Sequence, residues 1–169
     1  MGQKSIKILI AMLFAFQVSV HAQTNVDKAQ ALFIYNFLSH TMWPENFPMD
    51  NIKIGIYGTT NTSNTLQEFT KERKVGTKGI MVFPVNSLEE LSNCNVLLVA
   101  YNSSNKLPDI MSKVKNKPCL VITEKSGCIA SGAAIEFEIV NDKLKFRANL
   151  DNAKNQKLML SSALLNMSL

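Results

Sequence analysis

Four short apolar runs in the middle of the sequence limit the folds that this chain can adopt. They lie at residues 52–57, 80–83, 96–100 and 119–122. Stretches with helical character separate them, at residues 63–71, 87–91 and 108–114. Short buried strands that alternate with helices are typical of a largely parallel sheet. The sequence therefore predicts a single-domain, three-layer α/β fold in which helices flank the sheet.

The strongest local pattern lies near the C-terminus, at residues 134–149. Apolar and charged residues alternate on both sides of Asn141-Asp142, a pair that favours a two-residue turn, so we expect an antiparallel hairpin. The expected register places Glu136 opposite Arg147, which makes Arg147 either a cross-strand ion-pair partner or a ligand contact. The other expected cross-strand pairs are Glu138 with Lys145, Phe137 with Phe146, and Ile139 with Leu144.

The first 22 residues have the composition of a secretory signal peptide. Lys4 and Lys7 precede an uncharged, mostly apolar run at residues 8–20, and His21-Ala22 stand before the expected cleavage site. The run is too short to span about 30 Å of hydrocarbon comfortably. We therefore expect a signal peptide at residues 1–22 and an exported, periplasmic domain at residues 23–169.

The charge of the mature chain gives little support to a nucleic-acid partner. Removal of Lys4 and Lys7 lowers the formal net charge from +5 to +3. The remaining basic residues are scattered, and an acidic residue interrupts the basic run at residues 71–74. The mature length suits one domain with an ordinary core.

Residues 27–42 predict a helix that is apolar on two sides. We expect the sheet to cover one stripe and the C-terminal segment, residues 158–167, to cover the other. Pro44 should end the helix near Trp43, whose indole is then either a lid on the core or a contact surface. The two stripes are Ala29, Leu32, Phe33 and Phe37, and Ala31, Ile34, Tyr35, Leu38 and Met42; the expected partner-binding residues are Trp43, Pro44, Glu45 and Phe47.

Motifs for catalysis and metal binding are scarce. The sequence has no Gly-x-Ser-x-Gly, His-Glu-x-x-His or phosphate-loop motif, and His40 is the one histidine of the mature chain. We therefore expect no enzyme, no cofactor and no metal. Cys94 and Cys119 lie at corresponding ends of two predicted strands, so either they form a disulfide or all three cysteines are free.

A ligand cleft is the second site that the sequence suggests. The carboxyl ends of parallel strands commonly border such clefts, and Glu124 follows a predicted strand at the start of a loop with two glycines. Asn36 and His40 lie one turn apart in the first helix, close enough to bond each other or to face the cleft. Arg147 and Asn149 of the hairpin complete the set of candidate cleft residues.

Several segments, in this order, together resemble the YfiR-like family of periplasmic proteins. They are "KAQALFIYNFLSHTMWP", "IKIGIYG", "LSNCNVLLVA", "CLVITEKSG", "GAAIEFEIVNDKLKFRANLDNA" and "LMLSSALLNMS". The resemblance implies an α/β fold that is often dimeric and a regulatory role without catalysis. The family's best-known member holds an inner-membrane diguanylate cyclase inactive by binding its periplasmic part, and an outer-membrane lipoprotein relieves that repression. That member has two disulfides, which three cysteines cannot form.

Two functions follow as expectations. The first is a periplasmic regulator that represses the exported domain of a membrane signalling protein, with control of cyclic-di-GMP as the implied outcome. The alternative is a periplasmic small-molecule sensor subunit that serves a sensor kinase or an outer-membrane receptor system.

Overall fold

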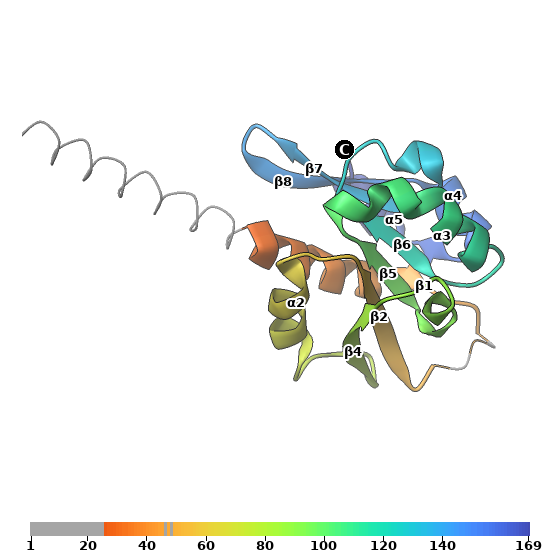
Figure 1. Ribbon diagram of the computed structural model, residues 1–169. Helices are drawn as coiled ribbons and strands as arrows, with labels where there is room; N and C mark the ends of the chain where they lie inside the picture. Colours follow the sequence, from red (N-terminus) through yellow and green to blue (C-terminus); the bar gives the residue numbers. More distant parts are fainter. Residues whose placement is uncertain (1–25, 46, 48) are drawn as a thin grey trace, which may run out of the picture.

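The computed structural model describes residues 26–45, 47 and 49–169, so the expected signal peptide lies outside the described residues. One seven-stranded sheet forms the centre of the molecule, with strand order β3-β4-β2-β5-β6-β7-β8 (Figure 1). Its strands are β2 (Asn51–Tyr57), β3 (Lys74–Val75), β4 (Lys78–Val85), β5 (Val96–Val99), β6 (Leu120–Thr123), β7 (Ile135–Val140) and β8 (Lys143–Ala148). The helices are the first helix (residues 26–39), α2 (Thr62–Thr70), α3 (Leu107–Val114), α4 (Leu150–Asn155) and α5 (Ser162–Met167). Short 3-10 helices lie at η1 (Glu90–Asn93), η2 (Tyr101–Lys106) and η3 (Ile129–Ser131).

The five inner strands are parallel, as the sequence predicts. β2 pairs in parallel with β4 and β5, β5 with β6, and β6 with β7, while β3 and β8 are antiparallel at the two ends. Every residue of β5 and β6 is buried, which explains why these strands read as continuous apolar runs. The α/β fold with a largely parallel sheet and a C-terminal hairpin is confirmed.

Alternate residues of the central strands feed two separate cores. On one face, Val96 and Leu98 pack with the first helix, α2 and the C-terminal elements. On the other face, Leu97 and Val99 pack with η1 and α3. Gly55 of β2 lies on this second face, where an added Cβ would come within 2.4 Å of the Cys94 sulfur. The sheet is therefore the middle of three layers.

Helix predictions were right for α2 and α3 and wrong at two other places. Residues 87–91 do not form a helix; a 3-10 turn, η1, begins only at Glu90. Residues 158–167 divide into a short strand, β9 (Met159–Leu160), and α5, so Ala163 and Met167 are exposed rather than part of one buried face. The break follows from Ser161, whose hydroxyl accepts the Leu164 N–H and so starts a new helix.

The first helix ends at residue 39, three residues earlier than predicted. Residues 41 and 42 instead form β1 (Thr41–Met42), which pairs antiparallel with β9. Both predicted stripes of the helix contain buried residues, namely Phe37 of the first and Ala31, Ile34 and Leu38 of the second. Each stripe also has one exposed member, because Leu32 of the first is 49% exposed and Met42 of the second is 53% exposed. The prediction of a helix covered on two sides was therefore right for the body of the helix and wrong for Leu32 and Met42. The C-terminal segment lies beside the end of the helix through β9.

The predicted hairpin register is confirmed in every pair, including Glu136 with Arg147 and Phe137 with Phe146. Asn141 and Asp142 have φ of 50° and 59°, as a two-residue turn of type I′ requires. One side-chain expectation fails, because Ile139 is 55% exposed near the hairpin tip. The hairpin projects beyond the helices that cover the rest of its apolar face (Figure 1).

Candidate functional site

A groove of about 570 Å³ lies at the carboxyl edge of the parallel sheet. The chain segments after β2, β5 and β6 each contribute to its lining, the β7–β8 hairpin forms one wall, and the start of the first helix forms another. Ligand sites commonly occupy this position in α/β sheets. The lining residues are Val26, Asp27, Gln30, Thr60, Tyr101, Glu124, Ser126, Phe137, Glu138, Ile139 and Leu144.

Glu124 joins three of the segments that form the groove. One carboxylate oxygen accepts a hydrogen bond from the Thr60 hydroxyl at 2.5 Å, and the other accepts the Tyr101 backbone N–H at 3.0 Å. Thr60 follows β2, Tyr101 follows β5 and Glu124 follows β6, so one carboxylate fixes three strand exits relative to one another. Such charge-assisted bonds are stronger than neutral ones.

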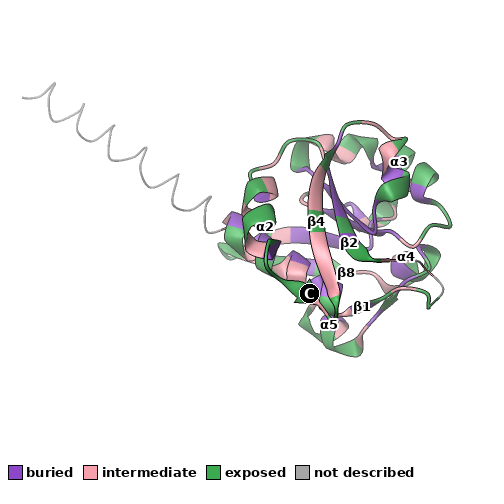
Figure 2. Cartoon of the chain, turned by 90° about the horizontal axis from the view of Figure 1, so that it is seen from below, coloured by how far each residue is buried: buried purple, intermediate pink, exposed green. Residues whose placement is uncertain are grey.

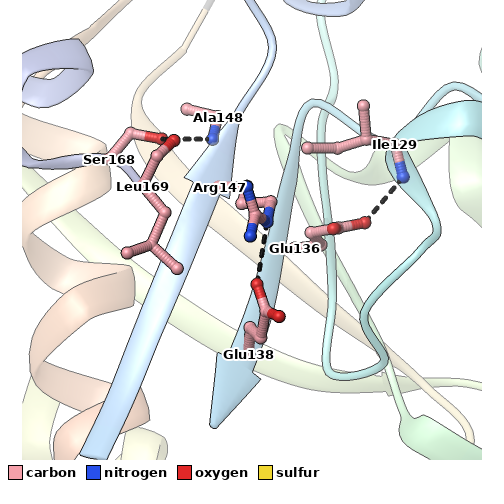
Figure 3. Close-up of polar contacts among 7 residues, drawn as sticks. All are labelled: Ile129, Glu136, Glu138, Arg147, Ala148, Ser168 and Leu169. Atoms are coloured by element: carbon pink, nitrogen blue, oxygen red, sulfur yellow. Dashed lines mark hydrogen bonds and ion pairs between the residues drawn. The ribbon is translucent and has the colours of Figure 1, made fainter. Parts of the chain in front are cut away.

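The charged side chains that line the groove are all acidic. They are Asp27, Glu124 and Glu138. Glu138 is paired with Arg147, whose Nε lies 2.8 Å from the carboxylate oxygen (Figure 3). Phe137 and Leu144 are among the apolar residues of the lining.

The predicted pairing of Arg147 with Glu136 was wrong, although the two residues are in register. Arg147 instead reaches diagonally to Glu138, while Glu136 is buried and accepts the Ile129 backbone N–H at 2.8 Å (Figure 3). The two carboxylates thus have different tasks, because Glu136 holds the loop before β7 and Glu138 faces the groove. The ion-pair interpretation of Arg147 holds with this change of partner.

The structure does not bring the five candidate cleft residues together. Glu124 lines the groove, and Arg147 reaches it only through Glu138. His40 Nδ1 lies 3.1 Å from the Ser161 hydroxyl, and Asn36 meets His40 through its backbone carbonyl. Asn149 caps α4, because its side-chain oxygen accepts the Asn152 N–H at 2.9 Å.

Sequence reasoning missed Thr60 and Tyr101, the two direct partners of Glu124. A signal for both was present, because each follows a predicted strand as Glu124 does, and the carboxyl ends of neighbouring parallel strands meet at one edge. Gln30, whose side-chain oxygen accepts the Thr62 hydroxyl, gave no such signal. It is a polar residue on the buried side of a helix.

The predicted partner surface is only partly free; its residues are Trp43, Pro44, Glu45 and Phe47. Trp43 packs against the core with part of its side chain, and its indole N–H donates to the Pro118 carbonyl at 3.2 Å. Of the two alternatives that the sequence leaves open for the Trp43 indole, these contacts favour a lid on the core. Pro44 and Glu45 are exposed, and Phe47 is half-buried.

Two exposed methionines extend this surface. Met42 of β1 and Met159 of β9 are directly opposite each other in the small two-stranded sheet, and they are 53% and 61% exposed. Methionine side chains are flexible and polarisable, and they are common at adaptable binding surfaces. We call Met42 and Met159 the methionine pair.

All three cysteines are free and buried in the structure. Burial raises the pKa of the Cys94 thiol to about 11 and also raises that of Cys119, so both stay protonated near neutral pH. A protonated, buried thiol is a poor nucleophile. Across the part of the chain that the structure describes, no group of three or more His, Cys, Asp or Glu could hold a metal ion. In the same residues no helix has the length and hydropathy needed to span a membrane.

The fold is that of a small α/β domain with a groove at the carboxyl edge of its parallel strands. The YfiR/HmsC-like family model matches residues 27–168, which is nearly the whole described chain. The chain therefore belongs to the YfiR/HmsC-like family. No curated protein sequence matches it.

Proposed function

We propose that this chain is a periplasmic regulatory protein that binds and represses the exported domain of an inner-membrane diguanylate cyclase. The family match over residues 27–168 carries the proposal, because regulation of this kind is what the resemblance implies. The proposal includes removal of residues 1–22 on export and a homodimeric mature chain. An outer-membrane lipoprotein is the proposed second partner, which relieves the repression.

The proposed contact with the cyclase is formed by the methionine pair with Pro44, Glu45 and Phe47. Met42, Met159 and Pro44 supply exposed apolar surface beside a partly buried aromatic side chain, Trp43. Aromatic and flexible apolar side chains provide much of the energy of protein interfaces. Direct catalysis has no part in this function.

The test is deletion of the gene in its native host, with cellular cyclic-di-GMP measured by mass spectrometry. Loss of a repressor should raise cyclic-di-GMP, and the full chain supplied in trans should lower it again. A chain without residues 2–22 is the control, because it should stay in the cytoplasm and fail to restore repression. An unchanged level of cyclic-di-GMP after deletion would contradict the proposed target.

A small-molecule sensor is the second candidate function, and the groove at Glu124 is the observation that favours it. Such a sensor would serve a sensor kinase or an outer-membrane receptor system. Native mass spectrometry of the chain purified from the periplasm tests for a bound metabolite. A mass adduct that disappears in Tyr101→Ala but persists in the exposed-surface control Met159→Ala would support this function. A chain that carries no adduct under any growth condition would speak against it.

A further inference from the structure

The two edges of the seven-stranded sheet differ in how well they are protected against pairing with a strand of another molecule. β8 carries three basic residues on one face, Lys143, Lys145 and Arg147. The end of the chain also covers its edge. The Leu169 N–H donates to the Phe146 carbonyl, and the Ser168 hydroxyl accepts the Ala148 N–H (Figure 3). Charges and covering segments of this kind prevent unwanted strand pairing.

β4, at the other edge, has no such protection along most of its length. β3 pairs only with Lys78 and Gly79, so among the residues that the structure describes no strand lies beside the outer edge of residues 80–84. These residues, Ile-Met-Val-Phe-Pro, include no charge and no polar side chain. Met81 is 51% exposed, and Figure 2 shows that most of β4 is only partly covered.

The backbone groups of Ile80 and Val82 point towards this open edge. Val75 and Lys78 flank a two-residue connection, so the Lys78 N–H and C=O face β3, away from β2. Backbone direction alternates along a strand, which places the groups of residues 80, 82 and 84 on the same outer side. Pro84 agrees with this assignment, because a proline within a strand must face a free edge.

Space for another strand exists beside this edge. A hollow of about 470 Å³ lies between α2 and β4. Ile80, Met81 and Val82 form its floor, and side chains of α2 form the opposite wall. Glu68 of α2 and Lys71, which follows α2 directly, bring one charge of each sign to the hollow.

We propose that a second copy of this chain pairs with the free edge of β4, antiparallel about a two-fold axis at Val82. The free stretch of residues 80–84 is centred on Val82, so the edge is complementary to itself. The two Val82 residues then exchange both backbone hydrogen bonds, and each Ile80 N–H meets the Pro84 carbonyl of the second copy. The two sheets join into one continuous sheet.

The charges at the two ends of β4 favour a second copy over an unrelated strand. Lys74 and Lys78 lie at the amino end, whereas the Glu90 carboxylate accepts the Asn86 N–H at 3.0 Å beside the carboxyl end. Antiparallel pairing brings the basic end of each copy to the acidic end of the other. This inference rests on the homodimer of the proposed function and assigns its interface.

Sedimentation velocity of the mature exported chain and of two matched proline variants tests the interface. Val82→Pro removes one outward N–H from the β4 edge, and Leu144→Pro removes the equivalent outward N–H from the β8 edge. Both side chains are half-buried, so the two changes are of similar size. The wild-type chain and Leu144→Pro should sediment as dimers, and Val82→Pro should sediment as a folded monomer.

Met81→Lys provides a second variant in case Val82→Pro does not fold. Met81 is half-exposed, so the fold should tolerate lysine there, and the two new charges lie diagonally across the proposed axis. Its dimer should dissociate at least tenfold more readily at low salt and recover partly at high salt. A wild-type chain that is monomeric would overturn both the homodimer and its interface. A dimer unaffected by Met81→Lys, or by a folded Val82→Pro, would overturn the interface alone.

Discussion

At the scale of single residues, Glu124 has the widest structural role in the groove. Its carboxylate accepts hydrogen bonds from Thr60, which follows β2, and from Tyr101, which follows β5. Removal of the carboxylate therefore releases the segments after both strands at once. Neither partner belongs to a hydrophobic core, so the effect should be limited to the carboxyl edge.

Glu124→Ala should lower the free energy of unfolding by about 1–2 kcal/mol, because two hydrogen bonds to a charged acceptor are lost at a partly exposed site. Urea denaturation measures the change. Glu124→Gln is the matched control, because the amide keeps one acceptor and should lose less. Equal stability of Glu124→Ala and the wild-type chain would show that the two bonds contribute nothing.

The buried cysteines give the fold a predictable sensitivity to alkaline pH. The pKa of Cys94 is raised to about 11 by burial, whereas a thiol in the unfolded chain titrates near about 8.5. Above about pH 8.5 the Cys94 thiol of the unfolded chain loses its proton, whereas the thiol of the folded chain keeps it. The protonated thiol therefore contributes fully to the free energy of unfolding below about pH 8.5, and this contribution declines as the pH rises towards the pKa of the folded chain.

We therefore expect the urea midpoint to fall between neutral pH and about pH 10, and to fall less steeply in Cys94→Ala. The difference between the slopes of urea midpoint against pH for the wild-type chain and for Cys94→Ala isolates the effect of the Cys94 thiol from the effects of all other groups. Parallel pH profiles for the variant and the wild-type chain would assign the decline to those other groups.

At the scale of elements, the first helix separates what sequence periodicity can predict from what it cannot. Spacing identified Ile34 and Leu38 as apolar positions of a helix, and both are buried. The same spacing placed Leu32 and Met42 in buried stripes, but their exposure is set by how far the sheet and α5 extend over the helix. The short elements β9 and α4 were not predicted, because two to six residues carry too little periodic signal.

Leu38→Ala should destabilise the chain by about 2–5 kcal/mol, because it leaves a cavity at a fully buried site. Leu32→Ala removes the same atoms from a half-exposed position of the same helix and should cost less than about 1 kcal/mol. Thermal melts of the two variants measure the difference. Similar melting temperatures would mean that Leu32 contributes as much to stability as the buried Leu38.

At the scale of the whole molecule, the first helix joins the two candidate sites. Asp27 and Gln30 line the groove at the carboxyl edge of the sheet, while Trp43, just beyond the other end of the helix, bonds to Pro118 before β6 begins. The two sites therefore lie at opposite edges of the parallel strands, about 20 Å apart along a helix of this length. The groove and the methionine pair are therefore separate surfaces of the molecule.

The hairpin and the parallel strands were predictable because local patterns determine them. The groove was only partly predictable, because Thr60, Tyr101 and Glu124 meet through strand order, which no local pattern contains. The same holds for the methionine pair. Met42 and Met159 are far apart in the sequence, and only the pairing of β1 with β9 brings them together.

The methionine pair supplies the last prediction, which concerns the surface that contacts the partner. Met42→Glu combined with Met159→Lys removes the exposed apolar surface, while opposite charges at facing positions preserve the pairing of β1 with β9. We expect this double variant to be exported and folded but to repress cyclic-di-GMP at least tenfold less effectively than the wild-type chain in the deletion strain, which corresponds to about 1.4 kcal/mol of lost binding. Leu32→Lys is the control, because it places a charge at a similarly exposed position of the first helix and should repress normally. Full repression by the double variant at wild-type protein levels would remove the methionine pair from the interface and leave Pro44, Glu45 and Phe47 as the surface to test.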